Sequence, residues 1–347
     1  MLHLSPLTLR LRRLLGRSVP DFYATAIERW EVSPACEMHF PAAVMLPGQL
    51  DRIRRTEFGT MRAVRAMFQG DLNPRIGPTM AYRFRDVDHA DGVLYCGGAE
   101  LHLRERKNRL PVYRRPDVSV SGSMYESWLG NRWFGNWLTD DCDTYFLAAE
   151  AGQPLTTAPA PAAGHVARYE ALQGMAPRRI GDAHFTDLVL FDNILNNEGR
   201  IARAKARRAL LTRGFDTSPG PGVFLMRGQT GDRRLLVNEL ALAEHLERRH
   251  GFRVMLPAEH SVDELVAACA RAPVIVGVEG SQLTHGLVAM PGGGALLTIQ
   301  PPERVTAALK LVCDRMGLRF GVVVAEGDAD SFRVDPAEVD RTLELLT

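Results

Sequence analysis

Short apolar runs alternate with longer amphipathic segments through the C-terminal part of the chain. Uninterrupted apolar runs predict buried strands, and apolar residues spaced three or four positions apart predict helices. The expected strands cover residues 223–226, 252–256, 274–278, 295–299 and 320–324. The expected helices cover residues 238–250, 261–270 and 303–316, with two more beginning near 282 and 336. Strands that alternate in this way with helices predict a doubly wound parallel sheet.

The N-terminal half has a less regular pattern. The expected elements are a strand pair over 92–104, a helix between Gly135 and residue 149, a strand over 184–191 and a basic helix over 199–213. A chain of 347 residues is long for a single hydrophobic core. We therefore expect two domains, over residues 1–198 and 199–347, with the boundary beside the basic helix.

Composition places the chain among globular proteins. Apolar residues make up 46% of it, charged residues 24%, and the net charge is +1. This balance argues against a general nucleic-acid binder, which would carry a marked basic excess. The five cysteines form no CxxC pair, so a cytoplasmic location is expected rather than a disulfide framework. The sequence contains no apolar run of the roughly 20 residues that a membrane-spanning helix requires.

Residues 2–17 form a basic amphipathic segment. They combine seven leucines with four arginines and contain no acidic residue. The small-residue cleavage site of a signal peptide is missing. Two interpretations remain open, which are a peripheral helix on an anionic membrane surface and a helix that docks on the domain with its arginines exposed.

Candidate chemistry gathers where the predicted parallel strands end, because ligands bind at the carboxyl edge of such sheets. Arg227 follows the first C-terminal strand, and Arg233 and Arg234 come soon after it. Glu279-Gly280-Ser281 lies between the expected strand over 274–278 and the helix that follows it. At such a turn, glycine allows close approach of a ligand, and free backbone N–H groups suit a phosphate. Guanidinium groups near such a turn predict a diphosphate site, and Glu279 could accept hydrogen bonds from sugar hydroxyls.

A second cluster lies on the helix that follows Gly135. Asn136, Asp140 and Asp143 share one face of it, which indicates either side chains directed into a cleft or a solvated acidic face. His285 is open to three interpretations, as a base, a phosphate donor or a packed core residue. Paired aspartates occur at positions 86 and 88, 141 and 143, and 328 and 330, but we assign no metal or cofactor to them. The GxGxxG dinucleotide fingerprint is absent, and Ser281 lacks the glycines of a nucleophile elbow.

Four motifs, taken in order, resemble the family 61 glycosyltransferases of capsule and lipopolysaccharide gene clusters and of eukaryotes. Residues 134–140 (FGNWLTD) are similar to the family's aromatic-Gly-His-Trp-Leu-x-acid helix, and residues 224–227 (FLMR) to its strand ending in arginine. Arg233-Arg234-x-x-x-Asn238-Glu239 is similar to its Arg-Arg-x-x-Asn-Glu segment. Residues 276–285 (VGVEGSQLTH) are similar to its Gly-x-His-Gly-Ala-x-Leu-Thr-Asn turn. The resemblance extends from residue 133 to the C-terminus.

This chain departs from the family pattern at four positions. Asn136 and Glu279 stand where the family usually has histidine, His285 replaces an asparagine, and Thr298 falls where an acid often follows the last strand. The change at Glu279 bears most directly on the contacts with the donor. These departures indicate a divergent branch or a relative that binds without transferring.

The resemblance implies a GT-B architecture of two Rossmann-like domains that face a cleft, and transfer from a nucleotide-sugar donor to a glycan or lipid-linked acceptor. It implies that Arg227, Arg233 or Arg234, Asn238 and the Gly280–Ser281 amides hold the donor without a metal, with Glu279 on the ribose or sugar. On the acceptor side, Asn136 and Asp140 face the cleft, and Asp140 is the expected general base. The alternatives are a catalytically inactive nucleotide- or glycan-binding relative in a polysaccharide assembly, and a different αβ enzyme such as an epimerase or a phosphohydrolase.

Overall fold

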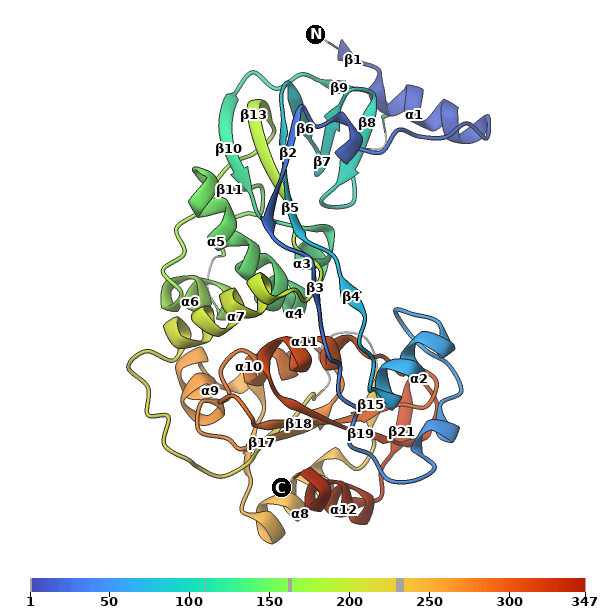
Figure 1. The fold of residues 1–347 in the computed structure, drawn as a ribbon, viewed down its shortest axis with the longest axis vertical. Helices are drawn as coiled ribbons and strands as arrows, with labels where there is room; N and C mark the ends of the chain where they lie inside the picture. Colours follow the sequence, from blue (N-terminus) through green and yellow to red (C-terminus); the bar gives the residue numbers. More distant parts are fainter. Residues whose placement is uncertain (1, 109, 162–163, 229–233, 347) are drawn as a thin grey trace. The chain divides into compact units, whose positions relative to one another are not determined.

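The computed structural model divides into two compact units (Figure 1). It describes residues 2–108, 110–161, 164–228 and 234–346. Unit 1 comprises Met1–Ala35 and Gly77–Arg200, and unit 2 comprises Cys36–Ile76 and Ile201–Thr347. The division between Arg200 and Ile201 lies inside a continuous helix, α7 (Glu198–Leu211).

Unit 2 contains a five-stranded, wholly parallel sheet in the order β16-β14-β17-β18-β19. Its strands are β14 (Val223–Leu225), β16 (Arg253–Met255), β17 (Val274–Val278), β18 (Ala295–Gln300) and β19 (Arg319–Val324). Counted along the chain this is order 2-1-3-4-5, a common doubly wound arrangement. The expected parallel sheet is therefore confirmed in this unit. The strand order reverses between β14 and β17, and doubly wound sheets bind ligands at that reversal.

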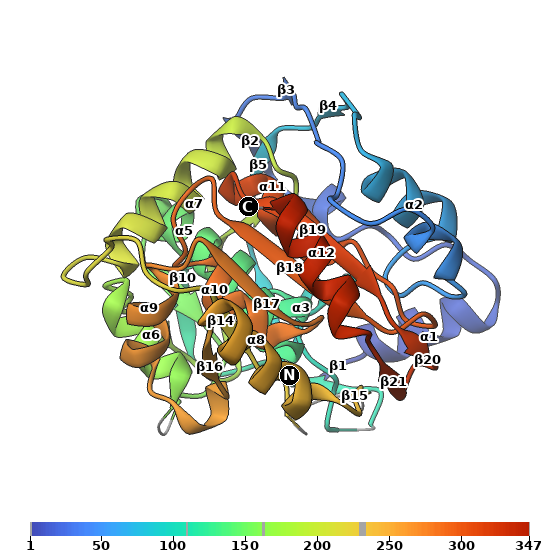
Figure 2. The same ribbon diagram turned by 90° about the horizontal axis from the view of Figure 1, so that it is seen from below.

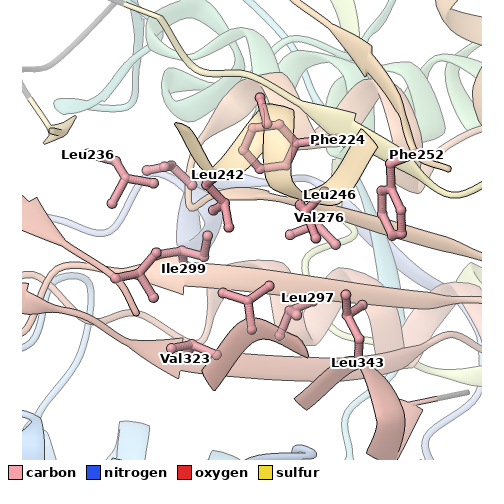
Figure 3. Close-up of a cluster of buried hydrophobic side chains, with 14 of the residues drawn as sticks. Phe224, Leu236, Leu242, Leu246, Phe252, Val276, Leu297, Ile299, Val323 and Leu343 are labelled. Atoms are coloured by element: carbon pink, nitrogen blue, oxygen red, sulfur yellow. The ribbon is translucent and has the colours of Figure 1, made fainter. Parts of the chain in front are cut away.

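Helices cover both faces of this sheet (Figure 1). They are α8 (Glu239–His250), α9 (Val262–Cys269), α10 (Thr284–Leu287), α11 (Ala308–Met316) and α12 (Pro336–Leu346). The predicted capping box opens α9, and Gly251 ends α8 in the left-handed conformation. Figure 3 shows the core under α8 and α12, where Leu242, Leu246 and Leu343 pack on the buried side chains of the strands.

Two expected helices of unit 2 are shorter than predicted. The segment after Gly280 forms only a 3₁₀ turn, η5 (Ser281–Leu283), followed by the four-residue α10. Helix α11 begins at Ala308 rather than near residue 303. Because η5 and α10 are so short, a long helix dipole does not face the Gly280 turn, and an anion there would depend on side chains instead.

The N-terminal segment Cys36–Ile76 belongs to unit 2, which the order of the chain did not predict. Val44 adds to the edge of β19, where it exchanges backbone hydrogen bonds with Phe320 and Val322. Arg52 forms a bidentate ion pair with Glu338 of α12. The segment also contains β3 (Cys36–Glu37), η2 (Gln49–Arg52), α2 (Met61–Gln69) and β4 (Arg75–Ile76). Elsewhere in unit 2, a small sheet consists of β15 (Leu235–Leu236), β20 (Glu326–Gly327) and β21 (Ser331–Arg333). The segment protects the edge of the parallel sheet.

Unit 1 is built on a nine-stranded mixed sheet, which corrects the expectation of a second wholly parallel one. Strands β10 (Ser119–Met124), β11 (Pro154–Thr156), β12 (Arg178–Arg179) and β13 (Ala183–Asp192) are parallel. Strands β2 (Glu28–Ser33), β5 (Thr79–Phe84), β6 (Val87–Ala90), β7 (Val93–Cys96) and β8 (Ala99–His102) are antiparallel to their neighbours. Two-residue turns at Asp91-Gly92 and Gly97-Gly98, all four with positive φ, join β6, β7 and β8. Such turns allow only antiparallel pairing.

The helices of unit 1 include a π-helical turn. They are α1 (Ser5–Leu14), α3 (Trp128–Arg132), α4 (Phe134–Asn136), the π turn η3 (Trp137–Asp141), α5 (Cys142–Ala151) and α6 (His165–Leu172). Strands β1 (Leu2–His3) and β9 (Tyr113–Arg114) form a separate two-stranded antiparallel sheet. The predicted helix after Gly135 is thus α4, η3 and α5 in succession, and π turns are frequent at functional sites.

Candidate functional site

The first candidate cluster lies where the strand order of unit 2 reverses. Strands β14 and β17 are hydrogen-bonded neighbours, with Val223 opposite Ile275 and Phe224 opposite Val276. Arg227 follows the end of β14, and Glu279 follows the end of β17. The adjacent parallel strands therefore bring the two predicted sequence positions to one edge of the sheet, the edge at which such folds bind ligands.

The guanidinium of Arg227 is packed against the Gly280 turn. A Cβ atom on residue 280 would lie 2.1 Å from Nη1 of Arg227, so that any side chain there would displace the guanidinium. Arg227 also donates from Nη1 to Oε1 of Gln282 at 3.3 Å, and the residue is 5% exposed. The need for glycine at position 280 is therefore steric.

Glu239 fixes the end of β14. Its carboxylate, on the first residue of α8, accepts hydrogen bonds from the backbone N–H groups of Arg227 at 2.7 Å and Gly228 at 3.1 Å. Burial raises the pKa of Glu239, and these two hydrogen bonds only partly oppose the shift. The carboxylate therefore holds the backbone that presents Arg227.

Glu279 and Arg234 form an ion pair with both side chains largely buried. Arg234 donates to Oε2 of Glu279, and the same Nη1 donates to the backbone oxygen of Glu279 at 3.1 Å. The carboxylate of Glu279 neutralises the guanidinium of Arg234, which would otherwise be available to a phosphate. In this state Glu279 is engaged by Arg234, which differs from the expected direct anchoring of a ribose.

The remaining C-terminal site residues have varied surroundings. Ser281 begins η5 and is partly buried. Asn238 exchanges two hydrogen bonds with the backbone of Val334, at 2.8 and 3.3 Å, which is a structural arrangement. His285 is 3% exposed within α10, which favours the packed interpretation over contact with a substrate. Arg233 lies outside the described residues.

The second cluster is in unit 1 and surrounds the π turn. Asn136 donates to Oδ2 of Asp140 at 2.9 Å, and Arg200 donates to Oδ1 of Asp140 at 2.5 Å. The Nε atom of Arg200 lies 3.7 Å from Oδ2 of Asp143. The three polar residues predicted to share a helix face are thus connected through Arg200, whose side chain is 2% exposed.

A network of buried polar groups continues beyond Asp143. Asn193 donates to Oδ2 of Asp143 at 2.8 Å and accepts a hydrogen bond from Thr79 at 3.2 Å. Asn197 donates to Thr79 and accepts from the backbone N–H of Arg200, which fixes the start of α7. The network rigidly supports the carboxylate of Asp140, the member of the cluster that is 27% exposed.

Asp141 is separate from this network and fully buried. It accepts hydrogen bonds from the hydroxyl of Ser127 at 2.7 Å and from its backbone N–H at 3.1 Å. Burial raises the pKa of Asp141 well above its ordinary value despite those hydrogen bonds. A Cβ atom on Gly130 would lie 1.9 Å from Oδ2 of Asp141, so this glycine leaves room for the carboxyl group.

Sequence reasoning missed Arg200, Asn193 and Gln282. Arg200 is the third residue of a helix whose many basic residues suggested an exposed face, so its burial gave no signal in the sequence. Asn193 follows the last strand of the mixed sheet, a position whose partners depend on the fold. Only Gln282 offered a signal, because it lies two residues after Gly280 in a motif already singled out.

The N-terminal segment docks through one face of α1. Leu9 is 1% exposed and packs with Ala90, Val93 and Tyr95, and Arg13 forms an ion pair with Glu100 at 2.5 Å. Leu7 is half-buried, and the other five leucines of the segment are exposed, namely Leu2, Leu4, Leu11, Leu14 and Leu15. Docking thus covers Leu9 and part of Leu7 and leaves an apolar, basic outer face. Among the helices in the described ranges, none has the length and apolar character needed to cross a bilayer.

The comparisons with known proteins agree with the motifs. Residues 134–296 match the family model described as Glycosyltransferase 61. This range includes Arg227 and Gly280 of the first cluster and Asn136, Asp140 and Asp143 of the second. Residues 134–296 are therefore assigned to glycosyltransferase family 61, which supports a glycosyltransferase activity in general terms. The comparison with curated proteins found no match.

Proposed function

We propose that this protein transfers a sugar from a nucleoside-diphosphate-sugar donor to a glycan or lipid-linked acceptor in capsule or lipopolysaccharide synthesis. The observation that carries the proposal is the Arg227 guanidinium held against Gly280 at the strand reversal of unit 2, within the range matched by the family. An arginine at this edge stabilises the diphosphate that departs during transfer, the task that a metal performs in other enzymes. The two units would form the two halves of a GT-B arrangement.

Arg234 would bind the diphosphate together with Arg227. Because Glu279 already pairs with Arg234, a bound diphosphate competes with that carboxylate, and the released Glu279 is then able to accept hydrogen bonds from ribose or sugar hydroxyls. Gly280 and Ser281 would contribute backbone amides, and Asn238 supports the fold nearby. His285, buried in α10, would act through packing.

Asp140 is the proposed general base toward the acceptor. Its ion pair with Arg200 favours the ionised carboxylate, the form that accepts a proton. Asn136, which donates to the other oxygen of Asp140, would orient the carboxylate. Arg200 acts through Asp140 and is therefore a positioning residue.

Nucleotide binding provides the test. Thermal unfolding and titration calorimetry with UDP, GDP, CMP and dTDP, with and without a chelator, should identify one nucleotide that binds without a metal. Loss of a charged hydrogen-bond donor costs about 1.5–3 kcal/mol, so Arg227→Ala should weaken that binding by about 10- to 100-fold. Arg319→Ala, which removes an exposed arginine at the opposite end of the sheet, is the matched control. Equal affinity in both variants would remove Arg227 from the site.

The alternative is a relative that binds a nucleotide or glycan without transferring it. The buried Arg234–Glu279 pair favours this alternative, because it neutralises one of the two described arginines of the site. Incubation with the nucleotide sugar that matches the bound nucleotide, and with lipid-linked and glycan acceptors, separates the two proposals. Binding without any release of nucleoside diphosphate would support the alternative.

We further propose that the protein works in the cytoplasm at an anionic membrane surface through α1. Exposed Leu11 and Leu14 would enter the interface while the neighbouring arginines contact lipid phosphates. Sedimentation with phosphatidylglycerol vesicles should capture the wild type and lose the Leu11→Ser/Leu14→Ser variant. Leu345→Ser, at an exposed leucine of α12, should behave as the wild type. Equal sedimentation of all three proteins would contradict this proposal.

A further inference from the structure

The C-terminal half of α8 and the middle of α12 hold a compact group of two histidines and one aspartate. His245 and His250 both direct Nε2 to the carboxylate of Asp340, at 3.0 Å and 2.8 Å respectively. One candidate ligand atom from each of the three residues lies within 4.8 Å of the other two. Among the described residues, no other group of three or more histidines, cysteines, aspartates or glutamates has that spacing.

We infer that His245, His250 and Asp340 form a binding site for a divalent transition-metal cation, with Zn²⁺ as the best-fitting ion. Two imidazoles and one carboxylate are a ligand set that suits zinc and excludes a preference for magnesium or calcium, which favour oxygen. Zinc bonds of about 2.0–2.2 Å at tetrahedral angles place ligand atoms about 3.3–3.5 Å apart. The two histidine–aspartate contacts, at 2.8–3.0 Å, need to open by only a few tenths of an ångström to reach that spacing.

The supporting structure around the group is rigid. Leu242 and Leu246 of α8 and Leu343 of α12 are buried in the same core, and Figures 1 and 2 show the two helices side by side. Asp340 is itself 6% exposed, whereas both histidines are partly exposed and give an ion a path of entry. Three protein ligands leave a fourth position open to water or another ligand.

Arg249 is the neighbouring group that opposes a cation. Its Nε atom lies 3.1 Å from Oδ2 of Asp340, but its side chain is 59% exposed and is able to turn into solvent. Binding of the ion replaces the protons that now lie between the histidine nitrogens and the carboxylate. The ion would join the end of α8 to α12 and so stabilise unit 2.

Titration calorimetry of the full chain with Zn²⁺ tests this inference. The wild type and His39→Gln, at an exposed histidine of the same unit, should bind one ion per chain with equal affinity. His245→Gln and His250→Gln should each weaken binding at least tenfold, which corresponds to the loss of one ligand. Arg249→Gln should tighten binding about fivefold, because a like charge is removed.

A second measurement requires no variant. Co²⁺ in place of Zn²⁺ should give the intense visible absorption of a tetrahedral site, and added Zn²⁺ should abolish it. No binding to the wild type, or equal binding in His39→Gln and His250→Gln, would overturn the inference and leave the group as a hydrogen-bonded contact between helices. Nucleotide affinity, measured in the same variants, should stay unchanged because Glu239 begins α8, about 9 Å along the helix from His245 and about 16 Å from His250.

Discussion

Replacing Arg200 by methionine should destabilise unit 1 while leaving unit 2 largely intact. The guanidinium is 2.5 Å from Asp140 and 3.7 Å from Asp143, with its side chain 2% exposed. Methionine keeps most of the volume and removes the charge, so two carboxylates lose their common partner. The side chain of Asp143 is 0% exposed, and water is therefore unable to replace that partner.

The magnitude follows from burial. Removing one member of a buried ion pair typically costs about 3–5 kcal/mol, because the remaining charge is left uncompensated. Asp140 is 27% exposed, so water screens its part of the loss. We therefore expect a decrease near the lower end, about 3 kcal/mol, in the free energy of unfolding of unit 1. That is a large fraction of the roughly 5–15 kcal/mol that stabilises a typical domain.

Tryptophan fluorescence during urea unfolding measures this change selectively. The four tryptophans of the chain are at positions 30, 128, 133 and 137, which all belong to unit 1. Far-ultraviolet circular dichroism follows both units, so the variant should shift the fluorescence transition and only part of the dichroism. Arg178→Met, at an exposed arginine of β12, is the control and should change stability by less than about 0.5 kcal/mol.

A second substitution checks the mechanism. Adding Asp143→Asn to Arg200→Met removes the buried carboxylate that has lost the Arg200 guanidinium and should recover part of the lost stability, which a double-mutant cycle measures as a coupling energy. A loss below about 1 kcal/mol in Arg200→Met, or no recovery in the double variant, would refute the reasoning from buried charge.

Three further predictions concern single positions. Glu279→Gln should free Arg234 and tighten nucleoside diphosphate binding, measured by calorimetry, by about tenfold for one strengthened charged contact. Unchanged affinity would show that the Arg234–Glu279 pair is not part of the donor site. Gly280→Ala should displace the Arg227 guanidinium and weaken the same binding, while a crystal structure of the variant with Arg227 unmoved would contradict the steric argument. The pKa of Asp141 is raised in the folded state, so its contribution to stability is complete below about pH 3.9 and declines as the pH rises through the raised value. Asp141→Asn should lack that decline when urea unfolding is compared across pH, and identical pH profiles would refute it.

Much of unit 2 could be predicted from the sequence because its signals are local. Residues 274–278 form a strand with the predicted bounds, and Ser261 with Glu264 gives the predicted capping box. The alternation of strands and helices specifies parallel strands because the crossover helices return the chain to the same edge. That rule also places Arg227 and Glu279 at one edge of the sheet.

The mixed sheet of unit 1 was predicted less well, although part of the signal was present. Asp91-Gly92 and Gly97-Gly98 are typical turns of tight hairpins, but the strand pair over residues 92–104 was predicted from alternation alone, and that range includes only the second turn. The association of residues 36–76 with unit 2 has no such local signature, since Val44 meets Phe320 only after both strands have formed.

The sequence by itself determined the parallel sheet of unit 2, the family, and which polar residues lie near the strand ends. Periodicity, caps and turn residues act over a few positions, so they are visible along the chain. Tertiary structure alone decided which charges meet: Arg234 with Glu279, Arg200 with Asp140, and two histidines of α8 with Asp340 of α12. Partners so far apart in sequence are chosen by packing and by the cost of leaving a buried charge unpaired, and neither is readable before the chain has folded.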